Sequence, residues 1–208
     1  MERIVSAATR LFAALGYDAT TLAQIAEAAD LDLDTVMELA GSKRELYLAV
    51  MERGYTEQKA LLEGALARID ESGAPQAAAS IHALIDEYLD FCLNNPDISA
   101  LLMHRWLGDA ADLRDLEQIY NEPLVRSVFT VFNRVAEAGL IASDADVELC
   151  VRTIAWTVII FVRYATMSSP PADFADGDRS VARFRTHLHR LTAQLLGLAP
   201  ANPAETSP

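Results

Sequence analysis

Residues 22–39 read LAQIAEAADLDLDTVMEL, and this stretch decides the fold because it has the spacing of a helix-turn-helix. Ala26 stands where the two helices of the motif cross closely, so a larger side chain would push them apart. Asp30 stands at the turn, where a positive φ is often needed, and Asp tolerates that conformation better than most residues. A motif of this kind offers its second helix to the major groove of DNA. Its small core is expected to hold three apolar side chains: Leu31, Val36 and Leu39.

Capping signals set the boundaries of the helices around this motif. In a capping box, a Ser or Thr and a Glu or Gln three residues later satisfy backbone donors at the start of a helix. Asp32 is the expected N-cap of the second helix of the motif, residues 33–40, and Gly41 ends that helix. The sequence has two capping-box pairs: Thr21 with Gln24, and Ser42 with Glu45.

The rest of the chain predicts an all-α protein, with a three-helix head and a helical-bundle body. About half of the residues are apolar, Ala and Leu dominate, and no long segment alternates with a period of two. Asp97 and Asp144 are the expected N-caps of the sixth and eighth helices, and the seventh is expected to be kinked or split at Pro123. The nine expected helices span residues 2–15, 22–29, 33–40, 43–69, 76–93, 98–107, 112–138, 145–167 and 178–196.

Composition argues against several classes of protein. The richest apolar stretch, residues 153–164, is too short to span a membrane, and the N-terminus enters an amphipathic pattern without a signal peptide. Cys92 and Cys150 lie far apart inside apolar helices, as expected of reduced core thiols in a cytoplasmic protein. The net charge of −13 disfavours non-specific binding to nucleic acid or to anionic membranes.

No catalytic or metal-binding pattern is present in the sequence. His187 and His189 are two residues apart on a helix and so point to different faces, whereas His82 and His104 are isolated. A Gly-rich phosphate loop, a nucleophile motif and an HExxH motif are all missing. We therefore expect neither an enzyme nor a bound cofactor or metal.

Five segments resemble the N-terminal signature of the TetR family of transcriptional repressors. They are IVSAATRLF at residues 4–12, GY at 16–17, ATTL at 19–22, IA at 25–26 and SKREL at 42–46. The resemblance is specific over residues 3–50, and beyond them it rests on length and helix count. It implies a helix-turn-helix DNA-binding domain at residues 1–47 and a ligand-binding and dimerisation domain at 48–198. The polar, Pro-rich tail at residues 199–208 is expected to be disordered.

The resemblance also implies how the head meets double-stranded DNA. In that family, the second helix of the motif reads the major groove, while the start of its first helix and a Lys at the start of the fourth helix contact phosphates. The hydroxyl of Thr21 suits this role because a helix N-terminus favours an anion. By position, the expected backbone contacts are Thr20, Thr21 and Lys43, and the expected reading face is Leu33, Asp34, Thr35, Met37 and Glu38.

The head departs from the family pattern in two ways. Where the family usually has a Tyr, a His or Tyr, and a Phe, this chain has Met37, Leu39 and Ala40. Residues 1–50 also carry four basic and eight acidic side chains, which weakens the attraction to phosphate, although a carboxylate can still accept a hydrogen bond from cytosine N4. Two alternatives stay open. One is a repressor that binds palindromic operator DNA, and the other is a TetR-fold protein with weakened or lost DNA binding that acts through protein or small-molecule binding.

The body is expected to hold an unknown small apolar ligand that releases the DNA. Ligand pockets of proteins are mostly apolar with few polar groups, and Arg163 offers a partner for an anionic group. Aromatic and Met side chains at helical spacing are, however, more often plain core. The candidate ligand-binding residues are Tyr88, Phe91, Met103, Trp106, Phe129, Phe132, Trp156, Arg163 and Tyr164.

The last two long helices carry more apolar surface than one core face needs. Packed against their symmetry mates, they would form a four-helix bundle and a two-fold interface. We therefore expect a homodimer. The candidate interface residues are Val151, Ile154, Val158, Phe161, Phe184, Leu188, Leu191 and Leu195.

Overall fold

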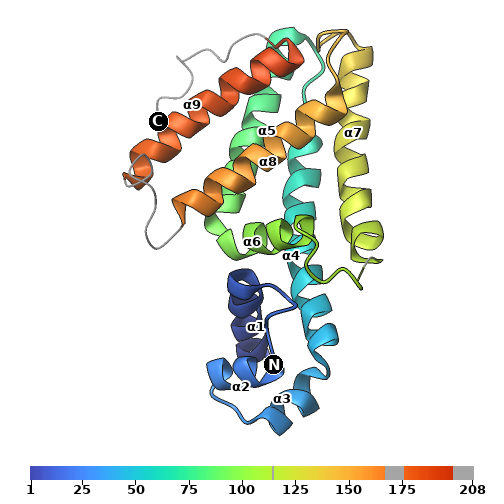
Figure 1. Ribbon diagram of the computed structural model, residues 1–208. Coiled ribbons are helices and arrows are strands. Elements are labelled where there is room, and N and C mark those ends of the chain that lie inside the picture. Colours follow the sequence, from blue (N-terminus) through green and yellow to red (C-terminus); the bar gives the residue numbers. More distant parts are fainter. Residues whose placement is uncertain (114, 167–175, 199–208) are drawn as a thin grey trace. The chain divides into compact units, whose positions relative to one another are not determined.

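The computed structural model describes residues 1–113, 115–166 and 176–198, and within these ranges it is helical without any strand (Figure 1). The prediction of an all-α fold is therefore confirmed. The helices are α1 Glu2–Leu15, α2 Leu22–Ala29, α3 Leu33–Ala40, α4 Lys43–Leu66, α5 Ala74–Asn94, α6 Pro96–Trp106, the π-helical turn η1 Glu117–Asn121, α7 Glu122–Glu137, α8 Val147–Ala165 and α9 Gly177–Leu196.

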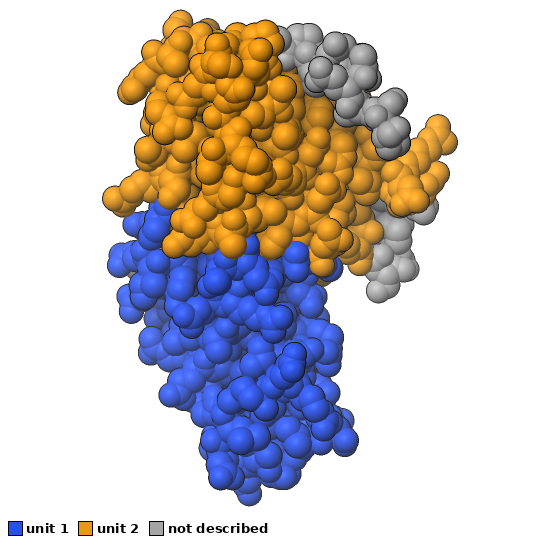
Figure 2. Space-filling view, turned by 180° about the vertical axis from the view of Figure 1, so that it is seen from behind, with its two compact units in different colours: residues 1–58, 95–123 blue, residues 59–94, 124–208 orange. Residues whose placement is uncertain are grey.

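The chain divides into two compact units, which Figure 2 shows in different colours. Unit 1 comprises residues 1–58 and 95–123, and unit 2 comprises the described residues of 59–94 and 124–208. The head predicted at residues 1–47 thus lies in a larger unit that also contains α6 and the segment after it. Since α4 is one continuous helix, it contributes residues to both units.

Unit 1 is held together by an aromatic core under the helix-turn-helix. Phe12 of α1 meets Tyr47 of α4 edge to face, with ring centroids 5.0 Å apart, and Tyr17 lies 4.7 Å from Tyr47. Such tilted and edge-on pairs add to the stabilisation from burial, because the edge of one ring meets the electron-rich face of another. Ile4 and Ile25 complete this core and are fully buried.

Both predicted capping boxes are present. The Thr21 hydroxyl oxygen accepts the backbone N–H of Gln24, and the Gln24 side chain accepts the backbone N–H of Thr21. Ser42 and Glu45 make the same reciprocal pair at the start of α4. These bonds satisfy backbone donors that would otherwise be unpaired at the helix ends, so α2 and α4 begin where the capping boxes predict.

Unit 2 has its core where α5, α7, α8 and α9 meet. Phe161 of α8 and Phe184 of α9 stack with centroids 3.8 Å apart, and the core around them is almost entirely aliphatic and aromatic. Cys92 and Cys150 are both buried free thiols, and the Cys150 thiol donates to the carbonyl oxygen of Leu195 at 3.3 Å. None of the described helices is long and apolar enough to cross a membrane.

Several predicted helix ends are wrong by a few residues. Helix α6 begins at Pro96, because a proline has no backbone N–H that would be left unpaired at the start of a helix. Asp97 therefore lies inside the first turn, and the N-cap is Asn95. The N-cap of α8 is Asp146 and not Asp144, because Asp146 accepts the N–H of Leu149 at 3.0 Å. The predicted helix at residues 112–138 is split before Pro123 by η1. The predicted loop at residues 168–171 and the tail at 199–208 lie outside the described residues.

Candidate nucleic-acid interface

The turn between α2 and α3 has the geometry that the sequence predicted. Asp30 adopts a left-handed conformation with φ of 55°, and the N–H of Leu31 donates to the carbonyl oxygen of Ala26. Ala26 is 3% exposed, which confirms that it lies where the helices cross. Val36 fills the small core, but Leu39 is 48% exposed, so its predicted place in that core is wrong.

Helix α3 presents an open face made of apolar and acidic side chains. Leu33, Asp34, Met37 and Glu38 are all exposed, so four of the five predicted reading residues are accessible. Thr35 is half-buried, and its hydroxyl and its N–H both donate to the Asp32 carboxylate at 2.8 Å. These two bonds lower the pKa of Asp32, so this carboxylate remains charged at the N-terminus of α3.

The two predicted threonine contacts differ in accessibility. Thr20 is fully buried, and its hydroxyl donates to the carbonyl oxygen of Gly16 at 2.6 Å. Its predicted role as a side-chain phosphate contact is therefore wrong for this conformation, because the hydroxyl serves the turn after α1. Thr21 is exposed at the start of α2, but its hydroxyl donates to Gln24 Oε1 at 3.1 Å, so an anion would be held there by the N-terminus of the helix rather than by this hydroxyl.

Lys43 already has internal partners. Its ammonium Nζ donates to the carbonyl oxygens of Tyr17 and Thr20 at 2.8 and 2.9 Å, and it lies 4.2 Å from the centroid of the Tyr17 ring. An ammonium has three donors, so one remains for a phosphate. Lys43 therefore fixes the turn after α1 to the start of α4, in addition to the role that the sequence predicts for it.

The helix-turn-helix itself carries no positive charge. Residues 11–42 contain six acidic side chains and no Lys, Arg or His. The nearby Arg3 donates to the carbonyl oxygen of Ala29 and lies 3.6 Å from the Asp30 carboxylate, which partly neutralises the turn. Of the cations on either side of this stretch, Lys43 and the exposed Arg44 at the start of α4 are the candidates for phosphate contacts, whereas Arg10 donates to Ser6 Oγ of α1.

The segment after α6 is tied to the turn after α1. The Asp109 carboxylate accepts the backbone N–H groups of Tyr17 and Asp18 at 2.6 and 3.0 Å, and the His104 ring nitrogen Nε2 lies 3.1 Å from the carbonyl oxygen of Ala13. Arg105 holds Asp109 in place by donating to its carbonyl oxygen. The sequence did not single out Asp109, since it lies 91 and 92 residues from its partners and belongs to no motif.

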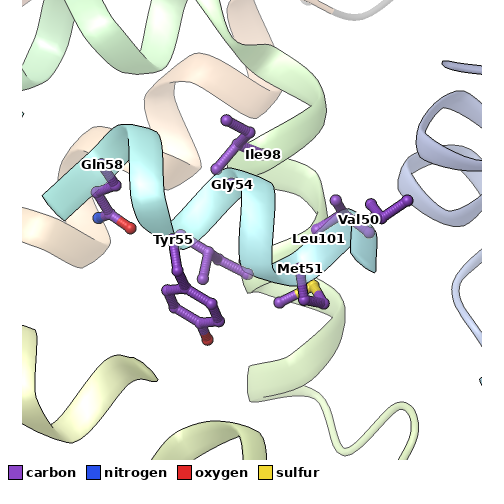
Figure 3. Close-up of a pocket in the computed structure, with 8 residues that line it drawn as sticks. Val50, Met51, Gly54, Tyr55, Gln58, Ile98 and Leu101 are labelled. Carbon is purple, nitrogen blue, oxygen red and sulfur yellow. The ribbon is translucent and has the colours of Figure 1, made fainter. Parts of the chain in front are cut away.

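A small pocket lies between α4 and α6 within unit 1 (Figure 3). Its enclosed free space is about 10 Å³, roughly enough for one water molecule and far below the roughly 300–1,000 Å³ of typical ligand sites. The Gln58 side chain is buried there, and its oxygen has no hydrogen-bond partner among the described residues. None of the predicted ligand-binding residues lines it. The lining residues are Val50, Met51, Gly54, Tyr55, Gln58, Ile98, Leu101 and Leu102.

The predicted ligand-binding residues are dispersed. Tyr88 and Phe132 lie in the core of unit 2, where burial raises the pKa of the Tyr88 phenol well above its usual value. Phe91 and Phe129 are partly buried in the same unit, whereas Met103 and Trp106 belong to unit 1. The other three predicted ligand-binding residues are exposed on α8: Trp156, Arg163 and Tyr164.

The predicted dimer residues divide by burial. Four of them are inside the protomer and thus form its own core: Ile154, Val158, Phe161 and Leu188. Their assignment to an interface is wrong because packing within the protomer already uses their surface. Four are partly buried: Val151, Phe184, Leu191 and Leu195. The apolar residues that α8 exposes are instead Leu149, Trp156, Ile160 and Tyr164.

Comparison with known proteins agrees with this geometry. Residues 4–50 match the model for the family "Bacterial regulatory proteins, tetR family". A tetR-family bacterial regulatory protein from Rhodococcus RHA1 is 25% identical with a TM-score of 0.67, and the match covers 95% of this chain and 97% of that one. A search of curated protein sequences gave no match.

Two more solved structures share the fold at lower identity. The ketosteroid transcriptional regulator KstR2 of Mycobacterium tuberculosis is 18% identical with a TM-score of 0.69, and the match covers 94% of this chain and 95% of that one. The regulator FadR from Bacillus subtilis, solved with stearoyl-CoA, is 14% identical with a TM-score of 0.65, at coverages of 95% and 99%. Residues 4–50 thus match the tetR family of bacterial regulatory proteins, and the chain over nearly its whole length shares the fold of solved regulators of that family.

Proposed function

We propose that this protein is a transcriptional repressor that binds palindromic DNA as a homodimer, with α3 in the major groove. A small apolar ligand would release the protein from the DNA. The observation that carries the proposal is the open face of α3, behind a turn with the required left-handed Asp30. Asp34 and Glu38 are the groups on this face that can accept from cytosine N4.

Few phosphate contacts are available to such a dimer. Lys43 and Arg44 provide two cations in each head, and the α2 N-terminus at Thr21 adds a neutral contact. Each phosphate that a cation neutralises contributes about −0.9 to the slope of log K against log salt.

The salt dependence of binding tests this part of the proposal. We expect a slope of roughly −3 to −4 for the dimer on an enriched site, since about four cations contact phosphates. Fluorescence anisotropy at several salt concentrations measures it. Arg44→Ala should make the slope shallower by about 2, whereas Arg179→Ala, an exposed cation at the start of α9, should leave it unchanged. A wild-type slope near −10, or no effect of Arg44→Ala, would contradict this assignment.

The exposed stripe of α8 supports the proposal of a dimer. Leu149, Trp156, Ile160 and Tyr164 recur at seven and four residues, so they share one helix face that the protomer leaves open. A second copy of α8 related by a two-fold axis would cover this stripe.

A charge in this stripe is expected to break the dimer. An unpaired charge buried in an interface costs about 3–5 kcal/mol, so Ile160→Arg should raise the dimer dissociation constant more than about a hundredfold. Leu107→Arg is the matched control, because Leu107 is 78% exposed and belongs to unit 1, whereas α8 belongs to unit 2. Sedimentation velocity measures both variants. Equal dissociation constants for the two variants would refute the proposed interface.

The proposal of a small apolar ligand draws support from a structural relative. FadR from Bacillus subtilis, which shares the fold, was solved with stearoyl-CoA. In this chain, the candidate site is the pocket between α4 and α6, where the Gln58 oxygen would accept a hydrogen bond from a ligand, but a molecule of this size would require α4 and α6 to separate there. A thermal-shift screen with fatty acids, acyl-CoAs and sterols tests it, because a ligand that binds the folded state raises its melting temperature.

A second candidate function rests on the charge of the head. Exposed acidic side chains surround the apolar face of α3, and this arrangement suits a cationic protein surface better than it suits phosphate. On this alternative, the protein keeps the TetR fold but acts through a protein partner. Failure to enrich any DNA sequence would favour it.

A further inference from the structure

His82 is a buried imidazole with both ring nitrogens unpaired. It lies on α5, is 4% exposed, and neither Nδ1 nor Nε2 has a hydrogen-bond partner among the described residues. Its ring stacks on that of His189 from α9, with centroids 4.7 Å apart and planes tilted by 23°. Since buried polar groups are nearly always hydrogen-bonded, this pair calls for an explanation.

The charged neighbours of this pair are already bonded to one another. The Asp86 carboxylate lies 2.8 Å from both His189 Nε2 and the Arg185 guanidinium, and Arg185 also contacts Asp90 at 2.5 Å. His82, Asp86 and Asp90 follow one another at intervals of four residues and so share the face of α5 toward α9. Both contacts use Asp86 Oδ1, and neither ring nitrogen of His82 is hydrogen-bonded to this carboxylate.

Among the described residues, the pKa of His82 is affected by the ionisable groups His189 and Asp86, and the buried side chains of α8 add no charge. The buried residues of α8 are aliphatic or aromatic, apart from Cys150, and burial raises the pKa of that thiol so that it stays neutral. Glu87, also on α5, is paired with Arg68, which follows α4. The ionisable groups that act on the pKa of His82 are thus His189 and Asp86.

We propose that His82, Asp86, Arg185 and His189 form a proton-operated latch, which holds α9 against α5 while His82 is neutral and opens on acidification. A proton on His82 places a positive charge in a buried position with no acceptor. That charge also lies against the stacked ring of His189, whose Nε2 is 2.8 Å from Asp86 Oδ1. Separation of α9 from α5 lets water solvate both rings.

The direction of the pH effect follows from the burial of His82. Desolvation, followed by the charge of His189, lowers the pKa of His82 in the closed form. The open form therefore binds the proton more tightly, so the closed form is favoured above the ordinary His pKa of about 6.5 and loses stability as the pH falls below it. For one proton taken up on opening, the opening constant rises by up to about tenfold for each pH unit in that range. The latch would give the protein a response to acid that needs no ligand and is independent of DNA binding.

Hydrogen exchange of the full-length protein tests the latch. With rates corrected for intrinsic exchange at each pH, we expect α9 peptides to lose up to about fivefold in protection between pH 6.5 and 5.5. His82→Phe keeps a stacking ring without a titrating nitrogen, so it should abolish this dependence. His187→Gln is the matched control on the exposed side of α9 and should keep the wild-type dependence. Equal protection of α9 at pH 5.5 and 7.5, or a wild-type slope in His82→Phe, would overturn the proposal.

A second measurement needs no folded variant at position 82. NMR titration of the four imidazole Cε1–H signals in the wild-type protein should show that His82 has a pKa below the ordinary His value, and His187→Gln and His189→Gln assist the assignment of its signal. If His82 instead titrates near 6.5 in the folded protein, the latch does not exist, because closed and open forms then bind the proton equally.

Discussion

Neutralising Asp34 and Glu38 together, as Asp34→Asn and Glu38→Gln, is expected to raise the affinity for non-specific DNA about tenfold at low salt. Both carboxylates are exposed on the face of α3 that would enter the groove, and no cation is present in residues 11–42 to offset them. At about 8 Å in water, each charge costs roughly 0.5 kcal/mol against one phosphate, and a dimer carries four such charges. The gain should shrink as salt is added, because ions screen the repulsion.

The control for this variant changes the same charge elsewhere. Glu137→Gln with Asp178→Asn removes two exposed carboxylates from unit 2, so it should leave DNA affinity nearly unchanged. Anisotropy titrations with a random-sequence duplex compare the two double variants at 50 and 200 mM salt. If both raise affinity equally, net charge alone governs binding. If neither does, α3 does not approach the phosphates, and the assignment of the reading face fails.

Asp109→Ala is expected to destabilise unit 1 by about 2–3 kcal/mol. Its carboxylate accepts two backbone N–H groups at the turn after α1, and hydrogen bonds to charged groups contribute roughly 1.5–3 kcal/mol each where water is partly excluded. Because Asp109 is only half-buried, we expect the loss of stability to be no larger than the smallest value that the two hydrogen bonds would give together. Asp109→Asn keeps one acceptor oxygen and should lose about half as much.

Urea unfolding and amide exchange at Tyr17 and Asp18 check this effect. The two amides should lose protection in Asp109→Ala before other amides of α1, because their acceptor is removed directly. Asp115→Ala, an exposed carboxylate of the same segment, is the matched control and should leave both measurements unchanged. Unchanged exchange at Tyr17 and Asp18 in Asp109→Ala would show that this tie does not form in solution.

Local signals predicted the head better than they predicted the rest of the fold. Capping boxes at Thr21 and Ser42 act within four residues, so the starts of α2 and α4 could be read from the sequence. The start of α8 was misplaced because Asp144 and Asp146 both precede the apolar pattern, and tertiary packing selects Asp146. Leu39 fits the helical period of a core residue, yet the short helix-turn-helix has no partner that covers it.

The side-chain sites depend on contacts between distant segments, which a single sequence does not reveal. Periodicity marks Ile154 and Leu188 as apolar but not whether a helix face turns toward its own core or toward a second copy. Thr20 and Lys43 match the family pattern, while the structure shows the first as buried and the second as bound to backbone carbonyls. The pairing of His82 with His189 joins residues that the sequence treated as isolated.

Selection from a random pool of double-stranded DNA tests the central claim, that α3 of a dimer reads DNA sequence, most directly. We expect enrichment of a palindrome. Its half-sites should be separated by about one helical turn, roughly 34–36 Å, or by a multiple of that distance. Base preferences at positions within each half-site should change in Asp34→Asn or Glu38→Gln if those carboxylates accept from cytosine. No enriched sequence at 50 mM salt, or an asymmetric site that both variants leave unchanged, would contradict the claim and favour a protein partner for the acidic head.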